Sequence, residues 1–369
     1  MKKKALIIAT VVGFITSFEM NDIKILQELG YEVIVAANYE GYNGKLDDKN
    51  VKMLDIRFTR SPLTLQNIKA FKKLNKYVKE NKIDLIHCHT PVGGVMGRII
   101  GKLNKVQTVI YTAHGFHFFD GAPKLNWVIY YPIEKFLSRY TDILITINQE
   151  DYNRAKNKFY AKKVEYIHGI GIDTEKIKHV LIDRKIKRKE LGIPNNAIVL
   201  ISVGELNINK NHSIIIQAIK EINNRNIYYL ICGQGNLEQE LKNLSQKLNI
   251  EDRVKILGFR KDIYELLKTS DIFVFPSKRE GLSVALMEAI CCELPVICSN
   301  IRGNNDLITN NVNGFLVENK LNEYIDQIKY VIKNNEVKYN IMKKNEQLIF
   351  EIDLKNIERK MNNIYKSLK

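Results

Sequence analysis

The order of apolar segments along the chain is the feature that most constrains its fold. Short runs rich in β-branched residues alternate with stretches of good helix formers, and the pattern restarts near residue 197. Such alternation predicts parallel sheets covered by helices on both faces. With 369 residues, the chain is also long enough for two domains of roughly 150–200 residues each. We therefore expect an α/β protein made of two Rossmann-like domains.

The expected elements can be placed by residue number. Strands are predicted at 5–12, 33–37, 83–87, 108–112, 143–147 and 164–167, with helices at 19–29, 65–80 and 93–103. The second series has strands at 197–203, 227–232, 254–257, 273–275 and 296–298, with helices at 213–222 and 238–248. Between them lies a charged stretch that ends in Gly192-Ile193-Pro194. We place the first domain at 1–178 and the second at 179–349.

Several classes of protein are disfavoured. The basic, apolar amino terminus could belong to a signal peptide, but no small-x-small cleavage site follows it, so a first strand is the better interpretation. No apolar run approaches the roughly 18–20 residues that span a bilayer. The five cysteines show no metal-ligand spacing, and His87 and His89 lack an evident third ligand, so we expect no metal site and a cytoplasmic protein with reduced thiols.

A net charge of +16 points to an anionic partner. Four lysines, Lys69, Lys72, Lys76 and Lys79, share one face of the helix predicted at 65–80. This face could bind anionic lipid headgroups, each lysine adding about 1 kcal/mol, or it could simply be solvated. Nucleic acid is not expected as a partner, because the chain shows no zinc finger, helix-turn-helix or RNP-like aromatic motif.

Two glutamates, Glu280 and Glu288, follow a buried strand that ends at Pro276. Glu280 should lie in the crevice at the carboxyl end of that strand, and Glu288 just over one turn into the next helix. Backbone N–H groups at the helix start would favour an anion such as a diphosphate; they belong to Gly281, Leu282 and Ser283. Since a carboxylate repels phosphate, we interpret Glu280 as an acceptor for sugar hydroxyls.

The spacing from Glu280 to Glu288, directly after Pro276-Ser277, resembles the Glu-x7-Glu motif of retaining glycosyltransferases of family 4. This resemblance covers nearly the whole chain. It implies that Glu280 contacts the donor sugar and Glu288 the nucleotide ribose. His114, at the end of a predicted strand, aligns with a family histidine near the reacting centre, so we assign catalytic roles to His114 and Glu280.

Other donor-binding residues are implied by the same resemblance. In Val203-Gly204-Glu205-Leu206-x3-Lys210, Gly204 and Lys210 match the loop that meets the diphosphate, whereas Glu205 replaces the usual Arg. Arg260 lies on the loop that meets the base, and Gly13 would end the first strand and let the backbone approach the donor. For the acceptor, Phe116 and Trp127 could stack on sugar faces or belong to the core.

The resemblance further implies a GT-B fold, in which two Rossmann-like domains face a central cleft and a final helix, 350–369, packs back onto the first domain. The expected enzyme is a metal-independent, retaining hexosyl- or N-acetylhexosaminyltransferase without a cofactor. Its expected substrates are a nucleotide-sugar, most simply a UDP-sugar, and a polyprenyl-diphosphate-linked sugar. It would act in bacterial capsule or exopolysaccharide biosynthesis, as a peripheral protein at the inner face of the cell membrane.

Two other functions remain open from the sequence. A nucleotide-sugar epimerase shares the fold and would need neither the membrane nor a second sugar site. A basic binding protein on an inactive transferase scaffold is the other alternative, because Glu205 removes one of the two usual cations at the diphosphate.

Overall fold

The chain folds into two compact α/β units. The computed structural model describes residues 2–59, 61, 64–334, 336 and 344–368. Unit 1 comprises Met1–Gly171 and Lys355–Lys369, and unit 2 comprises Ile172–Leu354. The boundaries expected from the sequence, 178/179 and 349/350, differ from this division by seven and five residues. The expected pair of Rossmann-like α/β domains is confirmed.

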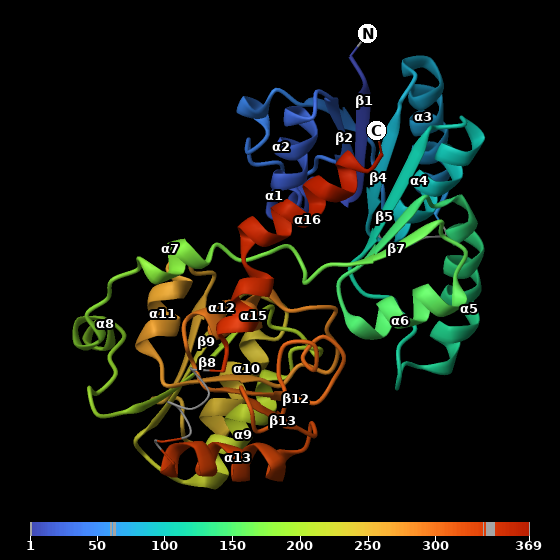
Figure 1. Ribbon diagram of the computed structural model, residues 1–369. Coiled ribbons are helices and arrows are strands. Elements are labelled where there is room, and N and C mark those ends of the chain that lie inside the picture. Colours follow the sequence, from blue (N-terminus) through green and yellow to red (C-terminus); the bar gives the residue numbers. More distant parts are fainter. Residues whose placement is uncertain (1, 60, 62–63, 335, 337–343, 369) are drawn as a thin grey trace. The chain divides into compact units, whose positions relative to one another are not determined.

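Within the described residues, unit 1 is built on a seven-stranded parallel sheet of order β3-β2-β1-β4-β5-β6-β7 (Figure 1). The strands are β1 Lys4–Val11, β2 Glu32–Asn38, β3 Lys52–Asp55, β4 Leu85–His89, β5 Thr108–Ala113, β6 Ile143–Thr146 and β7 Lys163–Tyr166. The helices are α1 Val12–Phe18, α2 Met20–Glu28, α3 Leu65–Asn81, α4 Pro91–Leu103, α5 Lys124–Leu137, α6 Gln149–Lys158 and, from the end of the sequence, α16 Leu354–Lys366. Strand order reverses between β1 and β4, and open α/β sheets bind ligands at such a switch point.

Both faces of the unit 1 sheet are buried. Along β1, Leu6 and Ile8 enter one core cluster while Ile7 enters the other, as the two-residue period of a strand requires. The cluster of Ile7 also receives side chains from α16, namely Ile357, Met361, Ile364 and Tyr365. In Figure 1, α16 (red) accordingly lies against unit 1. Residues of α16 and of β1 therefore belong to the same core cluster.

Unit 2 contains a six-stranded parallel sheet of order β10-β9-β8-β11-β12-β13 within the described residues. Its strands are β8 Ile198–Val203, β9 Ile227–Cys232, β10 Val254–Gly258, β11 Ile272–Phe275, β12 Val296–Ser299 and β13 Phe315–Val317. Its helices are α7 Thr174–Lys178, α8 Arg184–Glu190, α9 His212–Ile222, α10 Glu238–Lys247, α11 Ile263–Thr269, α12 Val284–Cys291, α13 Leu321–Lys333 and α15 Glu346–Ile352. The switch point here lies between β8 and β11.

Two local expectations were wrong. Gly13 does not end the first strand in a turn: β1 runs straight into α1, and Gly13 lies in the first turn of that helix. The single helix expected at 350–369 is broken at Asp353, whose extended backbone pairs with Ile172 in a parallel bridge. Because of this break, α15 belongs to unit 2 and α16 to unit 1.

No helix among the described residues combines the length and apolar character of a membrane span.

Candidate active site

Two loops meet at the carboxyl edge of the unit 2 sheet. One follows β8 and the other follows β11, the two strands that flank the switch point. Backbone N–H of Lys278 donates to the carbonyl oxygen of Asn209 at 2.8 Å, and the Asn209 side-chain amide donates to the carbonyl oxygen of Arg279 at 2.9 Å. These cross-bonds fix the loops to each other, so a ligand at this edge would meet both together.

Lys210 and Glu280, one from each loop, form an ion pair. The Lys210 Nζ lies 2.7 Å from Glu280 Oε1 and 4.5 Å from the centre of the Phe275 ring. Their side chains are only 17% and 12% exposed. Without a ligand the two charges neutralise each other. An anionic diphosphate could take over the ammonium of Lys210 and free the Glu280 carboxylate to accept hydrogen bonds from hydroxyl groups.

The start of α12 offers backbone donors beside this pair. Ser283 caps the helix by accepting a hydrogen bond from the N–H of Leu286 at 3.3 Å. Within the described residues, no acceptor is found for the N–H groups of Gly281, Leu282 and Ser283. A helix start with free N–H groups favours an anion. Further along α12, burial raises the pKa of Glu288 to about 7, although a hydrogen bond to Tyr264 opposes that rise.

Two glycines let neighbouring loops of unit 2 approach these two loops closely. Gly233 has φ +153°, and a Cβ built on it would lie 1.9 Å from the carbonyl oxygen of Gly204. Gly303 has φ +83°, and its Cβ would lie 2.5 Å from the carbonyl oxygen of Gly281. A side chain at Gly233 would push its loop away from Gly204 after β8. A side chain at Gly303 would push its loop away from Gly281 after β11. The aliphatic stem of Lys210 packs directly over Gly204.

The loop of Arg260 does not add free positive charge. Two nitrogens of the Arg260 guanidinium contact the Asp262 carboxylate at 2.6 and 2.8 Å, and Lys187 Nζ contacts the same carboxylate at 2.7 Å. These cations hold the pKa of Asp262 well below its ordinary range. Glu205, the departure from the family pattern, carries an exposed side chain. Lys210 is the cation that pairs with the Glu280 carboxylate, and the Arg302 guanidinium donates to the Glu280 backbone carbonyl at 3.3 Å.

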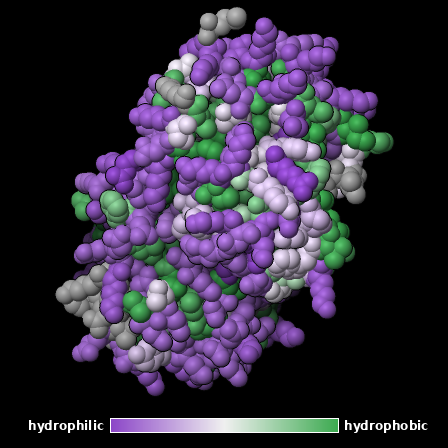
Figure 2. Space-filling view, turned by 45° about the vertical axis from the view of Figure 1, so that its right-hand side comes forward, coloured by the Kyte–Doolittle hydropathy of each residue, from purple (hydrophilic) through white to green (hydrophobic). Residues whose placement is uncertain are grey.

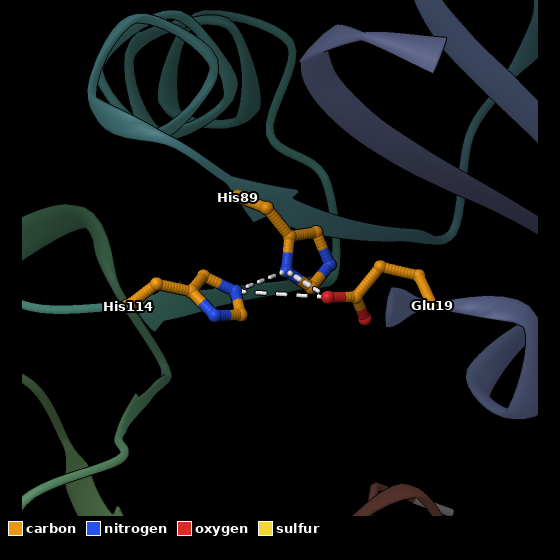
Figure 3. A group of neighbouring side chains, drawn as sticks. All are labelled: Glu19, His89 and His114. Atoms are coloured by element: carbon orange, nitrogen blue, oxygen red, sulfur yellow. Dashed lines mark hydrogen bonds and ion pairs between the residues drawn. The ribbon is translucent and has the colours of Figure 1, made fainter. Parts of the chain in front are cut away.

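In unit 1, a carboxylate and two imidazoles converge (Figure 3). Glu19 lies between α1 and α2, His89 ends β4, and His114 follows β5. Glu19 Oε1 is 3.2 Å from His89 Nδ1 and 3.6 Å from His114 Nε2, and the two nitrogens are 3.3 Å apart. His89 is fully buried and the side chain of Glu19 is 5% exposed, whereas that of His114 is 22% exposed.

Burial governs the protonation of this cluster. It lowers the pKa of His114 to about 4 and that of His89 well below its ordinary value, so both rings are neutral near pH 7. Burial also raises the pKa of Glu19, and the neighbouring charge of Asp22 raises it further. Asp22 itself is raised to about 6, again mainly by burial. A neutral imidazole such as His114 can accept a proton or a hydrogen bond from a substrate.

A chain of hydrogen bonds ties this cluster to the end of the sequence. The Tyr365 hydroxyl of α16 donates to Asp22 Oδ2 at 2.9 Å. His87 Nδ1 lies 2.7 Å from the same hydroxyl, and His87 Nε2 lies 2.7 Å from Thr112 Oγ1. Since the Tyr365 proton goes to Asp22, His87 carries its own proton on Nδ1. Asp22 is also hydrogen-bonded to Glu19.

Two hollows flank His114. One of about 40 Å³ is lined by Glu19, Asp22, Thr112 and His114 among others, and one of about 210 Å³ includes Thr90, His114 and Phe116. Phe116 is only 3% exposed and stacks on Phe118, so most of its ring is in the core. Trp127 does not line either hollow; it packs on Phe118 and Tyr131, with Arg154 over its ring.

Helix α5 presents an apolar stripe to solvent. Its exposed apolar side chains are Leu125, Val128, Ile129, Ile133 and Phe136, and Lys124 and Arg139 are exposed at its two ends. In Figure 2, apolar side chains (green) reach the surface among hydrophilic ones on the side that carries α5. The opposite face is held by a buried ion pair, in which Arg98 lies 2.8 Å from Glu134 Oε2. Arg98 also donates to the carbonyl oxygen of Gly94 at 2.8 Å and stacks on Tyr111.

The sequence placed some of these residues but not all. His114, Lys210, Glu280 and the start of α12 lie at sheet edges, as predicted. Glu19 was missed, because nothing in its local pattern distinguishes it from an exposed helix residue. A carboxylate in the segment that follows the first strand of a parallel sheet was the signal that could have found it.

Comparison with known proteins identifies similar chains. Residues 183–348 match the family model "Glycosyl transferases group 1", and residues 7–148 match "Glycosyl transferase 4-like". EpsD of Bacillus subtilis, a glycosyltransferase by its name, is 38% identical over 324 residues, which cover 86% of this chain and 84% of that protein.

A second relative comes from Escherichia coli and is named UDP-Gal:alpha-D-GlcNAc-diphosphoundecaprenol alpha-1,3-galactosyltransferase. It is 34% identical over 308 residues, covering 81% of this chain and 79% of that protein. Among solved structures, Anabaena Alr3699/HepE in complex with UDP and glucose superposes with a TM-score of 0.81 at 21% identity. That match covers 99% of this chain and 100% of the other, and it shows a common fold.

Proposed function

Since the chain belongs to the group 1 glycosyltransferases, GT-B enzymes of the capsular and exopolysaccharide type, we propose that it transfers a sugar from a UDP-sugar to a polyprenyl-diphosphate-linked sugar. The observation that carries the proposal is the Lys210–Glu280 pair beside the start of α12. Ammonium and backbone N–H groups suit the diphosphate, and a carboxylate suits the sugar hydroxyls. Two similar proteins support uridine as the base, one named for UDP-Gal and the other solved with bound UDP.

The proposed transfer is retaining and independent of metal at the donor. Charge developing on the leaving diphosphate would be stabilised by Lys210 and the α12 N–H groups, which are held in place before the donor binds. Neutral His114, at the edge of the unit 1 sheet, would hydrogen-bond to the sugar at the reacting centre. The transferred group would be a hexose or an N-acetylhexosamine, as in the names of the galactosyl- and N-acetylgalactosaminyltransferase relatives.

The two alternatives have less support. Two relatives that match four fifths or more of the chain at over 30% identity are named as glycosyltransferases, which disfavours an epimerase. A scaffold without activity was suggested by Glu205, yet that side chain is exposed while Lys210 remains beside Glu280.

A donor screen tests the proposed function. Purified protein with UDP-, GDP- and dTDP-sugars, without added metal, is expected to gain stability with one UDP-sugar. A ligand at 100 times its Kd stabilises by about 2.7 kcal/mol, which raises the melting temperature by roughly 5–10 °C in a unit of this size. Transfer to a synthetic polyprenyl-diphosphate-linked sugar should follow with the same donor. Thermal shifts with GDP- or dTDP-sugars alone would contradict the uridine proposal, and donor conversion without acceptor would favour the epimerase.

We further propose that the enzyme is peripheral at the inner face of the cell membrane and docks there through unit 1. Helix α3 exposes Lys69, Lys72, Lys76 and Lys79, as the sequence predicted, and the stripe on α5 supplies apolar side chains between Lys124 and Arg139. An apolar face with basic residues matches an anionic bilayer, into which such helices insert at headgroup depth. Docking would bring the enzyme to a lipid-linked acceptor.

Vesicle flotation tests this docking. Wild type is expected to float with vesicles that contain anionic lipid. The double variant Val128→Asp with Phe136→Asp is expected to reduce the bound fraction at least tenfold, because each exposed apolar side chain that enters lipid contributes on the order of 1 kcal/mol or more. Leu181→Asp in unit 2, where Leu181 is 93% exposed, is the matched control and should float normally. Equal flotation with neutral vesicles, or no effect of the α5 variant, would contradict the proposal.

A further inference from the structure

The geometry points to a second kind of site in unit 1: we propose that Glu19, His89 and His114 bind a borderline divalent metal ion such as Zn²⁺. The three candidate ligand atoms are Glu19 Oε1, His89 Nδ1 and His114 Nε2, and Figure 3 shows them turned toward one another. The sequence alone predicts no metal site, because His87 and His89 lack an evident third ligand there. The fold supplies the missing ligands from the end of β5 and from the junction of α1 and α2.

The distances suit a tetrahedral ion. Zn²⁺ binds imidazole nitrogen and carboxylate oxygen at about 2.0–2.2 Å, so two ligands of one tetrahedral ion lie about 3.3–3.6 Å apart. The observed separations are 3.2, 3.3 and 3.6 Å. All three atoms therefore lie near the corners of one tetrahedral face, without a rearrangement of the backbone.

The surroundings orient the Glu19 carboxylate and leave a position open. Glu19 is hydrogen-bonded to Asp22, which accepts a further hydrogen bond from the Tyr365 hydroxyl at 2.9 Å. Such outer partners orient a ligating carboxylate. On the other side, the hollow of about 40 Å³ beside Glu19 and His114 has room for a water molecule as the fourth ligand. An ion could enter past His114, which is partly exposed.

The ligand set selects the class of metal. Two imidazoles and one carboxylate suit Zn²⁺, Co²⁺, Ni²⁺ or Fe²⁺, whereas Mg²⁺ and Ca²⁺ prefer sites made of oxygen. This ion would not serve the donor diphosphate, which is proposed to bind at Lys210 in unit 2. By occupying His114 Nε2 it would instead withdraw that nitrogen from substrate, so the expected consequence is inhibition of transfer.

Metal binding can be measured without any substrate. Full-length protein without a histidine tag, stripped with a chelator, is titrated with Co²⁺ while its visible d–d absorption is recorded, and Zn²⁺ affinity is measured by calorimetry. We expect one equivalent of either ion per chain, and displacement of the Co²⁺ spectrum by Zn²⁺ but not by Mg²⁺. Glu19→Gln and His89→Asn should each weaken Zn²⁺ binding by more than the roughly 10–100-fold that loss of an outer-shell partner costs.

A matched control and a stability readout make the result decisive. His179→Asn removes an exposed histidine of unit 2 and should leave the Zn²⁺ affinity unchanged. Thermal unfolding of each variant, with and without Zn²⁺, shows whether it is folded and whether the ion still stabilises it. Absence of Zn²⁺ binding by wild type, or undiminished binding by folded Glu19→Gln and His89→Asn, would overturn the proposal. These outcomes do not depend on the donor or acceptor, so they are separate from the test of the transferase function.

Discussion

Replacing Glu280 with glutamine is expected to lower kcat for sugar transfer by about 100-fold or more, the usual cost of removing one preorganised group from a transition state. Glutamine keeps the shape of the side chain but removes the charge that accepts hydrogen bonds from sugar hydroxyls. It also removes the negative charge that neutralises the Lys210 ammonium 2.7 Å away. The freed ammonium should hold a diphosphate at least as well as before. Catalysis is therefore expected to fall while affinity for UDP stays the same or rises.

This split between turnover and nucleotide affinity can be measured by steady-state kinetics and by calorimetry with UDP. Lys210→Gln should show the opposite pattern in calorimetry, namely weaker UDP binding. Glu238→Gln is the matched control, because Glu238 forms an exposed ion pair with Lys242 in the same unit. An unchanged kcat in Glu280→Gln would show that Glu280 does not belong to the site. Weaker UDP binding by that variant would show that the Glu280 carboxylate of the wild type does not compete with UDP for Lys210.

Replacing Arg98 with methionine is expected to destabilise unit 1 by about 3–5 kcal/mol, since breaking a buried ion pair leaves one charge uncompensated. Arg98 is fully buried and Glu134 is 8% exposed. At about 2–4 °C for each kcal/mol, the melting temperature of the unit should fall by roughly 6–20 °C. The only tryptophan of the sequence, Trp127, lies in unit 1, so its fluorescence during heating reports on this unit.

Two further variants separate the ion pair from general effects. Arg98→Met combined with Glu134→Leu removes both charges and should recover much of the lost stability, because an apolar pair of similar volume can replace a buried ion pair. Lys24→Met breaks an exposed pair with Glu28 and should change the free energy of unfolding by no more than about 0.5 kcal/mol. A single Arg98→Met variant that melts like wild type would refute this assignment of stability.

The sequence could predict those parts of the molecule that depend on local pattern. Alternating apolar runs located the buried strands, and the strand–proline–helix pattern placed Glu280 at a sheet edge. The ion pair between Lys210 and Glu280 could not be foreseen, because it depends on β8 and β11 being neighbours in the sheet. The hydrogen bond between Asp22 and Tyr365 could not be predicted either, because it joins residues from opposite ends of the sequence that only the fold brings together.

Helix α5 shows how periodicity alone can mislead. Val128, Ile129, Ile133 and Phe136 recur at helical spacing, which ordinarily marks a buried face. Here that face is exposed, because Arg98 lies inside the unit and draws Glu134 on the opposite face inward. Phe116 is the converse case. Its position suggested an exposed ring that could stack on a sugar, but the ring is mostly buried beside Phe118.

The return of α16 to unit 1 has a consequence for synthesis on the ribosome. Domains usually fold as they emerge, beginning with the amino-terminal one. Unit 1, however, needs Ile357, Met361, Ile364 and Tyr365 for its core, and these emerge only after all of unit 2. Unit 2 can therefore be complete while the nascent unit 1 still exposes the apolar surface that α16 will cover. Unit 1 therefore begins to be translated before unit 2 but finishes folding after it.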